Sequence, residues 1–245
     1  MVKAFFRSFL VAMAVLTRLP VPSIDSFSAE EKGRGLIWFP VIGALMGLIL
    51  AAIAWQLQGV EPVLASVILL TVWMFVSELH HLDALARSIS AWFFGEVCAP
   101  AEETDNVTPS APHLGVMGVM ALVMMVKFAA LSVLIEYKVW PYIMLAPLTA
   151  RLLVIALIGF TPIAQGEDRA HEFRIEFPYI ALFIWLLMAV PMALVAGVSM
   201  FAVFVTLVLI RYRMKSTCGG LRWESIGAAI VLLEAVGLFA AALMA

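Results

Sequence analysis

Long apolar runs separated by short polar segments occupy most of this 245-residue chain. A helix that crosses a bilayer needs about 17–25 residues, and runs of that size lie at 36–57, 62–79, 114–135, 139–160 and 226–245. The stretch 178–210 is too long for one span and contains Pro191 and Gly197, which predicts a hairpin of two short spans, 178–194 and 196–210. The five runs and the two short hairpin segments make seven candidate segments. We predict an all-α polytopic membrane protein with about six transmembrane helices in a single integral membrane domain, residues 1–245.

The first segment, residues 1–22, starts with basic residues and has an apolar stretch that is short for a span. A secretory signal peptide would be followed by a small-residue cleavage site, whereas Arg18 and two prolines follow here. We therefore predict an N-terminal interfacial or re-entrant helix, with Arg7 and Arg18 near the lipid headgroups.

Basic residues give the expected orientation. The segment 211–224 contains four of them, which predicts a basic cytoplasmic loop. Threading the spans from there places the polar segments 80–113 and 161–177 on the same side, while the connections 58–61 and 136–138 are very short. We expect a multi-pass protein of the cytoplasmic (inner) membrane, with its polar loops in the cytoplasm. A transporter needs access from both sides and fits this asymmetry less well.

Composition supports a membrane protein. The chain is 64% apolar and 13% charged, with a mean hydropathy of +1.06, whereas soluble domains are about half apolar and a quarter charged. The net charge of −2 is too small to suggest nucleic acid as a partner. Cys98 and Cys218 both fall in segments assigned to the cytoplasm, where we expect no disulfide.

Four charged side chains lie inside stretches that otherwise resemble membrane helix: Glu78, Lys127, Arg151 and Glu234. Such residues usually face a protein interior or a water-filled cavity and often mark a functional site. From a rise of 1.5 Å per residue, Arg151 and Glu234 lie about 14 and 12 Å from the cytoplasmic ends of their spans, so they can pair directly. Two interpretations stay open: a substrate-facing cavity, or buried ion pairs that only fix helix packing.

The segment 80–113 begins with an amphipathic pattern. One side of the predicted helix is apolar and carries Leu82, Leu85, Ile89, Trp92 and Phe93. Another face carries Asp83, Arg87 and Ser90, and the spacing lets Asp83 pair with Arg87. We expect this helix to lie along the cytoplasmic interface of the membrane. His80, His81 and Asp83 lack the spacing of a zinc site, and residues 96–113 are predicted to form an acidic loop.

Several short motifs follow one another in a fixed order: LTRLPVP at 16–22, RG at 34–35, FPVIG at 39–43, HLD at 81–83, GG at 219–220 and IGA at 226–228. Together with Lys127, Arg151 and Glu234, their order and spacing resemble the cobalamin-5'-phosphate synthase family, also called adenosylcobinamide-GDP ribazoletransferase. The resemblance covers nearly the whole chain. It implies a membrane-embedded enzyme that joins α-ribazole, or its 5'-phosphate, to adenosylcobinamide-GDP with release of GMP. Corrinoid and nucleotide substrates, the lipid bilayer and Mg²⁺ are the implied partners, and a homo-oligomer is possible.

The chain departs from the family pattern where the acidic residues should stand. In an HLDGLADTxDG-type motif, Asp83 is kept but Arg87 and Ser90 replace two aspartates, and Arg222-Trp223-Glu224 stands where TGD is typical. Mg²⁺ prefers carboxylate and other oxygen ligands. Here the guanidinium of Arg87 can neutralise the Asp83 carboxylate in place of a magnesium ion. We therefore hypothesise that the usual magnesium site is lost or weakened.

The resemblance then assigns candidate roles. Asp83, Glu224 and His81 are the candidate catalytic residues, and Asp83 and Glu224 are the candidate metal ligands. The candidate substrate contacts are Arg34, Lys127, Arg151, Arg222 and Glu234. Two alternatives remain: a diverged relative that binds corrinoid or scaffolds membrane enzymes without catalysis, and a small transporter.

Overall fold

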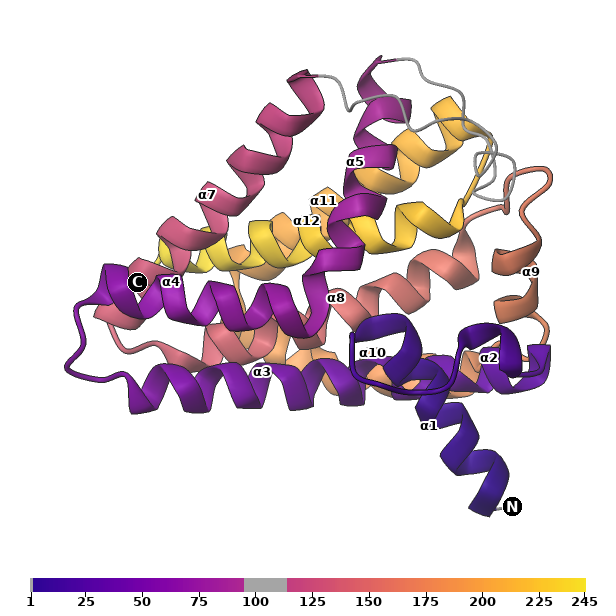
Figure 1. Cartoon of the computed structure of the whole chain (residues 1–245), viewed down its shortest axis with the longest axis horizontal. Helices are drawn as coiled ribbons and strands as arrows, with labels where there is room; N and C mark the ends of the chain where they lie inside the picture. The colour runs from indigo at the N-terminus through magenta and orange to yellow at the C-terminus, as the bar shows by residue number, and fades with distance from the viewer. Residues whose placement is uncertain (1, 95–113) are drawn as a thin grey trace.

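The computed structural model describes residues 2–94 and 114–245, and most of them belong to helices (Figure 1). Within these ranges there is no β-strand, only isolated bridges at 58/60 and 163/221. The helices are α1 (Val2–Leu16), η1 (Ile24–Ser26), α2 (Ala29–Gly35), η2 (Leu36–Trp38), α3 (Phe39–Gln56), α4 (Pro62–Trp73), η3 (Met74–Glu78), α5 (Leu79–Phe94), α7 (Leu114–Glu136), α8 (Trp140–Phe160), α9 (Asp168–Arg174), α10 (Tyr179–Ala196), α11 (Val198–Cys218) and α12 (Trp223–Ala242).

The number of possible spans agrees with the sequence pattern. Among the described residues, four helical stretches are long and apolar enough to cross a membrane: Ala29–Gln56, Leu114–Glu136, Trp140–Phe160 and Trp223–Ala242. Two further spans result if each bent pair counts as one, namely α4 with α5, bent by 84°, and α9 with α10, bent by 82°. The predicted all-α polytopic membrane fold with about six transmembrane helices is confirmed, and α1 is the short apolar helix expected at the N-terminus.

Two glycines bring the backbones of α3 and α8 into contact. A Cβ atom on Gly43 would lie 2.7 Å from the carbonyl oxygen of Pro147, and one on Gly47 would clash with the carbonyl oxygen of Met144. Small residues spaced four apart let membrane helices approach closely, since no side chain separates them. This contact places Arg151, one turn after Pro147, against the core face of α3.

The bend between α4 and α5 coincides with η3, a single turn of π-helix. The C-terminal end of α1 docks on this turn: the Arg18 amide donates to the Val76 carbonyl at 3.0 Å, and the Ser77 hydroxyl donates to the Leu16 carbonyl at 3.1 Å. The first bond gives the Val76 carbonyl of the π-helical turn a partner on another segment, and the second gives a partner to the Leu16 carbonyl at the end of α1. The bend turns α5 away from the axis of α4 (Figure 1).

Helix α5 has protein partners for its apolar face, while its position at the membrane interface stays a prediction. It packs against α12 and also contacts α7 and α11, so Leu85, Ile89 and Trp92 are buried between protein helices. Ser90, predicted to share the polar face with Asp83, is only 6% exposed. The amphipathic period was correct, but a period cannot distinguish a lipid surface from a neighbouring helix as the partner of the apolar face.

The predicted basic loop 211–224 is mostly helix. Helix α11 continues to Cys218, so Arg211, Arg213 and Lys215 lie on its last turns, and the connection to α12 spans only residues 219–222. No strong helix breaker precedes Gly219, which ends the helix with a φ of 71°, and cations are favourable near a helix C-terminus. This connection, α2 and α9 lie at one end of the bundle, away from the short α3–α4 connection (Figure 1).

The expectation that the cysteines stay reduced is wrong for Cys218, which is disulfide-bonded. Cys98 and the predicted acidic loop 96–113 lie outside the described residues. The expectation came from the redox compartment alone. Disulfide formation also depends on whether two side chains meet at bonding distance, which their separation along the chain does not determine.

Candidate functional site

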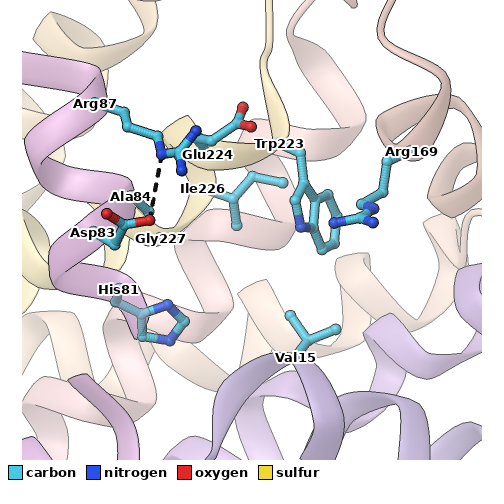
Figure 2. A pocket seen from close by; sticks show the side chains of 10 residues that line it. All are labelled: Val15, His81, Asp83, Ala84, Arg87, Arg169, Trp223, Glu224, Ile226 and Gly227. Carbon is cyan, nitrogen blue, oxygen red and sulfur yellow. Dashed lines mark hydrogen bonds and ion pairs between the residues drawn. The ribbon is translucent and has the colours of Figure 1, made fainter. Parts of the chain in front are cut away.

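A polar pocket of about 240 Å³ opens where α1, α5, α9 and α12 meet (Figure 2). We call it the polar pocket and define it by its lining residues: Val15, His81, Asp83, Ala84, Arg87, Arg169, Trp223, Glu224, Ile226 and Gly227. Figure 2 shows His81, Asp83 and Arg87 on one side and Trp223 with Arg169 on the other. The pocket therefore joins all the candidate catalytic residues, although α5 and α12 are far apart in the sequence.

On the α5 side, Asp83 and Arg87 form the predicted pair. Arg87 Nε lies 3.3 Å from Asp83 Oδ2, and the two side chains are 70% and 49% exposed for Asp83 and Arg87, respectively. An exposed pair of this kind stabilises a helix by only a few tenths of a kcal/mol. The pair is therefore weak enough for both groups to turn toward a charged ligand in the pocket. His81, two residues before Asp83, is buried at 4% exposure.

On the opposite side, the N-terminal end of α12 lies at the pocket. Glu224 lies in the first turn of α12, where the helix dipole favours a carboxylate. Trp223 stacks on Phe173 of α9, with ring centroids 4.3 Å apart. A Cβ atom on Gly227 would lie 2.8 Å from the Ala84 Cβ and 3.1 Å from His81 Nδ1. The absence of a side chain at 227 thus lets α5 approach α12 closely enough to form one wall of the pocket.

The segment before α9 is tied to the segment before α12. The Ala164 amide donates to the Leu221 carbonyl at 3.1 Å, and the Leu221 amide donates to the Pro162 carbonyl at 2.7 Å. These bonds hold two polar connections, which are distant in sequence, at the same edge of the pocket. They position Arg169 and Glu224 at opposite sides of a common space (Figure 2).

Behind this edge, Glu167 and Arg222 form a partly buried pair. The Glu167 carboxylate is 6% exposed and lies 3.9 Å from Arg222 Nη1. Burial raises the pKa of Glu167, and the nearby charge of Glu224 raises it further, while hydrogen bonds from the Trp223 and Ala170 amides and the charge of Arg222 oppose the shift. Arg222 thus contacts a protein carboxylate and does not line the polar pocket.

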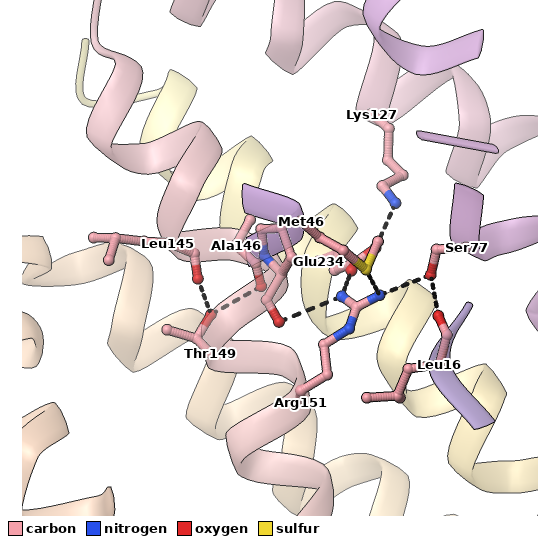
Figure 3. A network of polar contacts seen from close by, with 10 residues as sticks. Leu16, Met46, Ser77, Lys127, Leu145, Ala146, Thr149, Arg151 and Glu234 are labelled. Atoms are coloured by element: carbon pink, nitrogen blue, oxygen red, sulfur yellow. Dashed lines mark hydrogen bonds and ion pairs between the residues drawn. The ribbon is translucent and has the colours of Figure 1, made fainter. Parts of the chain in front are cut away.

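Three of the four deep charges, Lys127, Arg151 and Glu234, form a separate network in the core (Figure 3). The side chain of Glu78 lies outside the described part of the structure. Lys127 Nζ lies 2.8 Å from Glu234 Oε2, and Arg151 forms an ion pair with the other oxygen of the same carboxylate. Arg151 also donates to the Ser77 hydroxyl at 2.9 Å, and Lys127 Nζ lies 4.3 Å from the centre of the Trp73 ring. All three charged side chains are completely buried. The expected Arg151–Glu234 pair is confirmed.

The structure therefore divides the predicted substrate contacts. Lys127, Arg151 and Glu234 face the protein interior but have no exposed surface and do not line the polar pocket. This arrangement matches the interpretation in which buried ion pairs fix helix packing. Arg34 lies on the surface and pairs with Glu176 at 2.8 Å, also away from the pocket. Contact with substrate stays a prediction for these residues.

Two pocket residues were not identified from the sequence. Arg169 lies on the short helix α9, and Trp223 stands between two motif residues that were singled out. A sign was present in the segment 161–177, which was placed on the same membrane side as 80–113 and contains several basic residues. Which of these residues faces α5 depends on the bend between α9 and α10, which the sequence pattern does not give.

Comparisons with known proteins identify the family of the chain. The family model described as cobalamin-5-phosphate synthase matches residues 8–242. The chain belongs to the cobalamin-5-phosphate synthase family. Among its relatives are the adenosylcobinamide-GDP ribazoletransferases of Pseudomonas aeruginosa, 34% identical over 97% of this chain and 98% of the relative, and of Pseudomonas putida, 32% identical over 92% and 94%. No solved structure is significantly similar to the chain.

A member of the cobalamin-5-phosphate synthase family is expected, from the resemblance, to use magnesium. Among the residues that the structure describes, no three or more carboxylate, histidine or cysteine side chains gather as a metal site. Asp83 is paired with Arg87, and Ser90 is buried outside the polar pocket. Asp83 and Glu224 nevertheless line one pocket, and one or two carboxylates alongside phosphate and water are what a magnesium ion usually takes. The loss or weakening of the magnesium site therefore stays a prediction.

Proposed function

We propose that this chain is a membrane transferase that joins α-ribazole, or its 5'-phosphate, to adenosylcobinamide-GDP and releases GMP. Family membership and the names of its relatives support the reaction. The single structural observation that carries the proposal is the polar pocket, in which Asp83 and His81 of α5 meet Glu224 of α12. Transfer to an alcohol needs acid–base groups and cations in one place, and the pocket supplies both.

In the proposed step, the ribazole hydroxyl oxygen attacks the cobinamide-side phosphorus of the diphosphate. A new P–O bond forms, the bridging P–O bond breaks, and its electron pair leaves with GMP. The hydroxyl proton passes to the carboxylate of Asp83 or Glu224, either directly or through His81. A positioned base of this kind accelerates proton transfer by about 10²–10⁴-fold.

The diphosphate and the departing GMP carry negative charge that cations must stabilise. Arg87 and Arg169 reach the polar pocket from α5 and α9, on either side of Glu224 (Figure 2). We assign both to the phosphates. Arg87 would exchange Asp83 for a phosphate oxygen, which frees the Asp83 carboxylate to accept a proton. Among the described residues, the ion-pair partner of Arg169 is Asp25, with Arg169 Nη2 3.8 Å from Asp25 Oδ1, and at this distance Arg169 can likewise turn inward.

The size of the pocket limits how the substrate can bind. A volume of about 240 Å³ is below the roughly 300–1,000 Å³ that encloses a drug-sized ligand. We infer that only the diphosphate and the attacking ribose enter, while the corrin ring and the guanine stay outside the described pocket. We further infer that the pocket faces the cytoplasm, because basic residues at the end of α11 lie at the same end of the bundle. The inner membrane is the matching location.

The test is GMP release by the purified full chain in detergent, with adenosylcobinamide-GDP and α-ribazole supplied, in the presence and absence of MgCl₂. We expect Asp83→Asn and Glu224→Gln each to lower kcat, with the residue that accepts the proton costing about 10²–10⁴-fold. Glu136→Gln is the matched control, because Glu136 is exposed at the far end of α7.

Two results would overturn the site. Full activity in both carboxylate variants would remove the polar pocket from the reaction, whatever the wild-type rate. Micromolar Mg²⁺ binding by titration calorimetry, abolished by Asp83→Ala, would show that Asp83 is a metal ligand and that Arg87 does not take the place of the ion. No GMP release from the folded wild type would contradict the proposed activity itself.

A further inference from the structure

A second cavity lies elsewhere in the bundle and shares no lining residue with the polar pocket. Its volume is about 470 Å³, and we call it the apolar groove. It is lined by α5, α7, α11 and α12 through Ile89, Trp92, Phe93, Val119, Thr206, Leu209, Ile210, Tyr212, Arg213 and Leu232. Its lining contains no acidic side chain and a single basic one.

The groove has a charged end and an apolar body. Arg213 lies with its guanidinium carbon 4.9 Å from the centre of the Phe93 ring, and Tyr212 beside it is 65% exposed. Tyrosine next to arginine near the end of an apolar helix typically marks the level of the lipid headgroups. The remaining lining residues of α11, Thr206, Leu209 and Ile210, lie one to two turns deeper along the helix. The groove therefore runs from the headgroup level into the hydrocarbon layer.

Arg213 has the environment of an anion-binding group. Within the part of the chain that the structure describes, its guanidinium has a ring as partner and no carboxylate within ion-pairing distance. Lys215, two residues after Arg213, adds positive charge at the same end of α11. Basic pockets between transmembrane helices are typical sites for anionic lipid headgroups, and the attraction falls away within a Debye length.

We propose that the apolar groove binds one anionic phospholipid, with the headgroup phosphate at Arg213 and an acyl chain along Leu209, Ile210 and Leu232. A lipid is the occupant that the geometry favours, because the lining of the groove is mainly apolar and two of its four helices, α7 and α12, are long and apolar enough to cross a membrane. The Thr206 hydroxyl already donates to the Ala202 carbonyl of its own helix at 2.9 Å. The Thr206 hydroxyl is thus satisfied, whereas the buried Trp92 indole N–H has no hydrogen-bond partner among the described residues.

The fluorescence of Trp92 can report on the groove, because Trp92 lines it and is 5% exposed. The full chain is reconstituted in vesicles that contain phosphatidylcholine or phosphatidylglycerol with bromine on the acyl chains, which quenches tryptophan fluorescence on contact. The Trp92 contribution is obtained by subtracting the signal of Trp92→Phe. We expect brominated phosphatidylglycerol to quench the Trp92 fluorescence at about one-fifth of the mole fraction that brominated phosphatidylcholine requires. The reason is that one headgroup contact with a basic residue gives about a fivefold preference in binding.

Variants then assign the preference to Arg213. Arg213→Gln should remove it and Arg213→Lys should keep it. Lys215→Gln, which deletes the same charge on the same helix outside the groove, should leave most of it. Circular dichroism and elution volume in detergent confirm that each variant is folded.

Equal quenching by the two lipids, or an unchanged preference in folded Arg213→Gln, would overturn the proposal. Trp92 fluorescence that neither lipid quenches would show that another part of the protein or a second copy fills the groove. Loss of quenching when adenosylcobinamide-GDP is added would assign the groove to the substrate instead. These results do not depend on catalysis, so they are separate from the test of the transferase activity.

Discussion

Replacing Glu234 with glutamine should destabilise this protein strongly while keeping the size of the side chain. Glu234 contacts both Lys127 and Arg151, and the three side chains have no exposed surface. Removing one partner of a buried ion pair leaves uncompensated charge in the interior and typically costs about 3–5 kcal/mol. Here one substitution removes the shared partner of two cations, so we expect the upper part of that range.

Thermal unfolding in detergent provides the measurement. For a protein of this size, 1 kcal/mol corresponds to roughly 2–4 °C in Tm, so a cost of about 4–5 kcal/mol lowers Tm by about 8–20 °C. Lys127→Met should cost less, because Arg151 and Glu234 stay paired after one cation is removed. The double variant Lys127→Met/Glu234→Gln should be more stable than the sum of the single changes predicts, because neighbouring groups in one network are not additive.

The exposed Glu136→Gln serves as the control and should stay within about 0.5 kcal/mol of the wild type. A Tm for Glu234→Gln within 2 °C of that control would refute the reasoning. It would mean that water or lipid headgroups reach the network, and that the interpretation as sealed packing charges is wrong. A substrate-facing cavity would then again be the better account of Lys127 and Arg151.

Two further predictions concern the polar pocket. Gly227→Ala should push α5 away from α12, because the new Cβ atom would lie 2.8 Å from the Cβ atom of Ala84. GMP release should fall more than in the control Gly118→Ala, where the new Cβ atom has no neighbour within 4 Å. Glu167→Gln should change the pH dependence of stability. Because the pKa of Glu167 is raised in the fold, its contribution is fully present at acidic pH and is lost as pH rises through that pKa.

A specific result would contradict each of these two predictions. Equal activity in Gly227→Ala and Gly118→Ala would show that the spacing of α5 and α12 does not shape the site. For Glu167, the comparison is the free energy of unfolding of wild type and Glu167→Gln from pH 4 to pH 8. Parallel curves would show that burial does not shift this carboxyl, whereas a wild-type curve that falls relative to the variant as pH rises is the expected result.

Much of the candidate site was identified from the sequence because its chemistry is local. The Asp83–Arg87 pair follows from a spacing of four on one helix. Resemblance to the family singled out Asp83, His81 and Glu224, which line one pocket in the structure. Arg169 was missed because α9 reaches the pocket through a bend of 82°, and no pattern in the sequence specifies that angle.

By itself, the sequence determined the helices and the membrane environment, since apolar runs of span length have few other stable arrangements. It also determined that Lys127, Arg151 and Glu234 avoid lipid, because an isolated charge in hydrocarbon is costly. Only the tertiary structure decided whether those charges line a cavity or neutralise one another. That choice depends on the distances between helices. The close contact of α3 with α8 and the bend before α5 set these distances, and the spacing of side chains within one helix does not encode them.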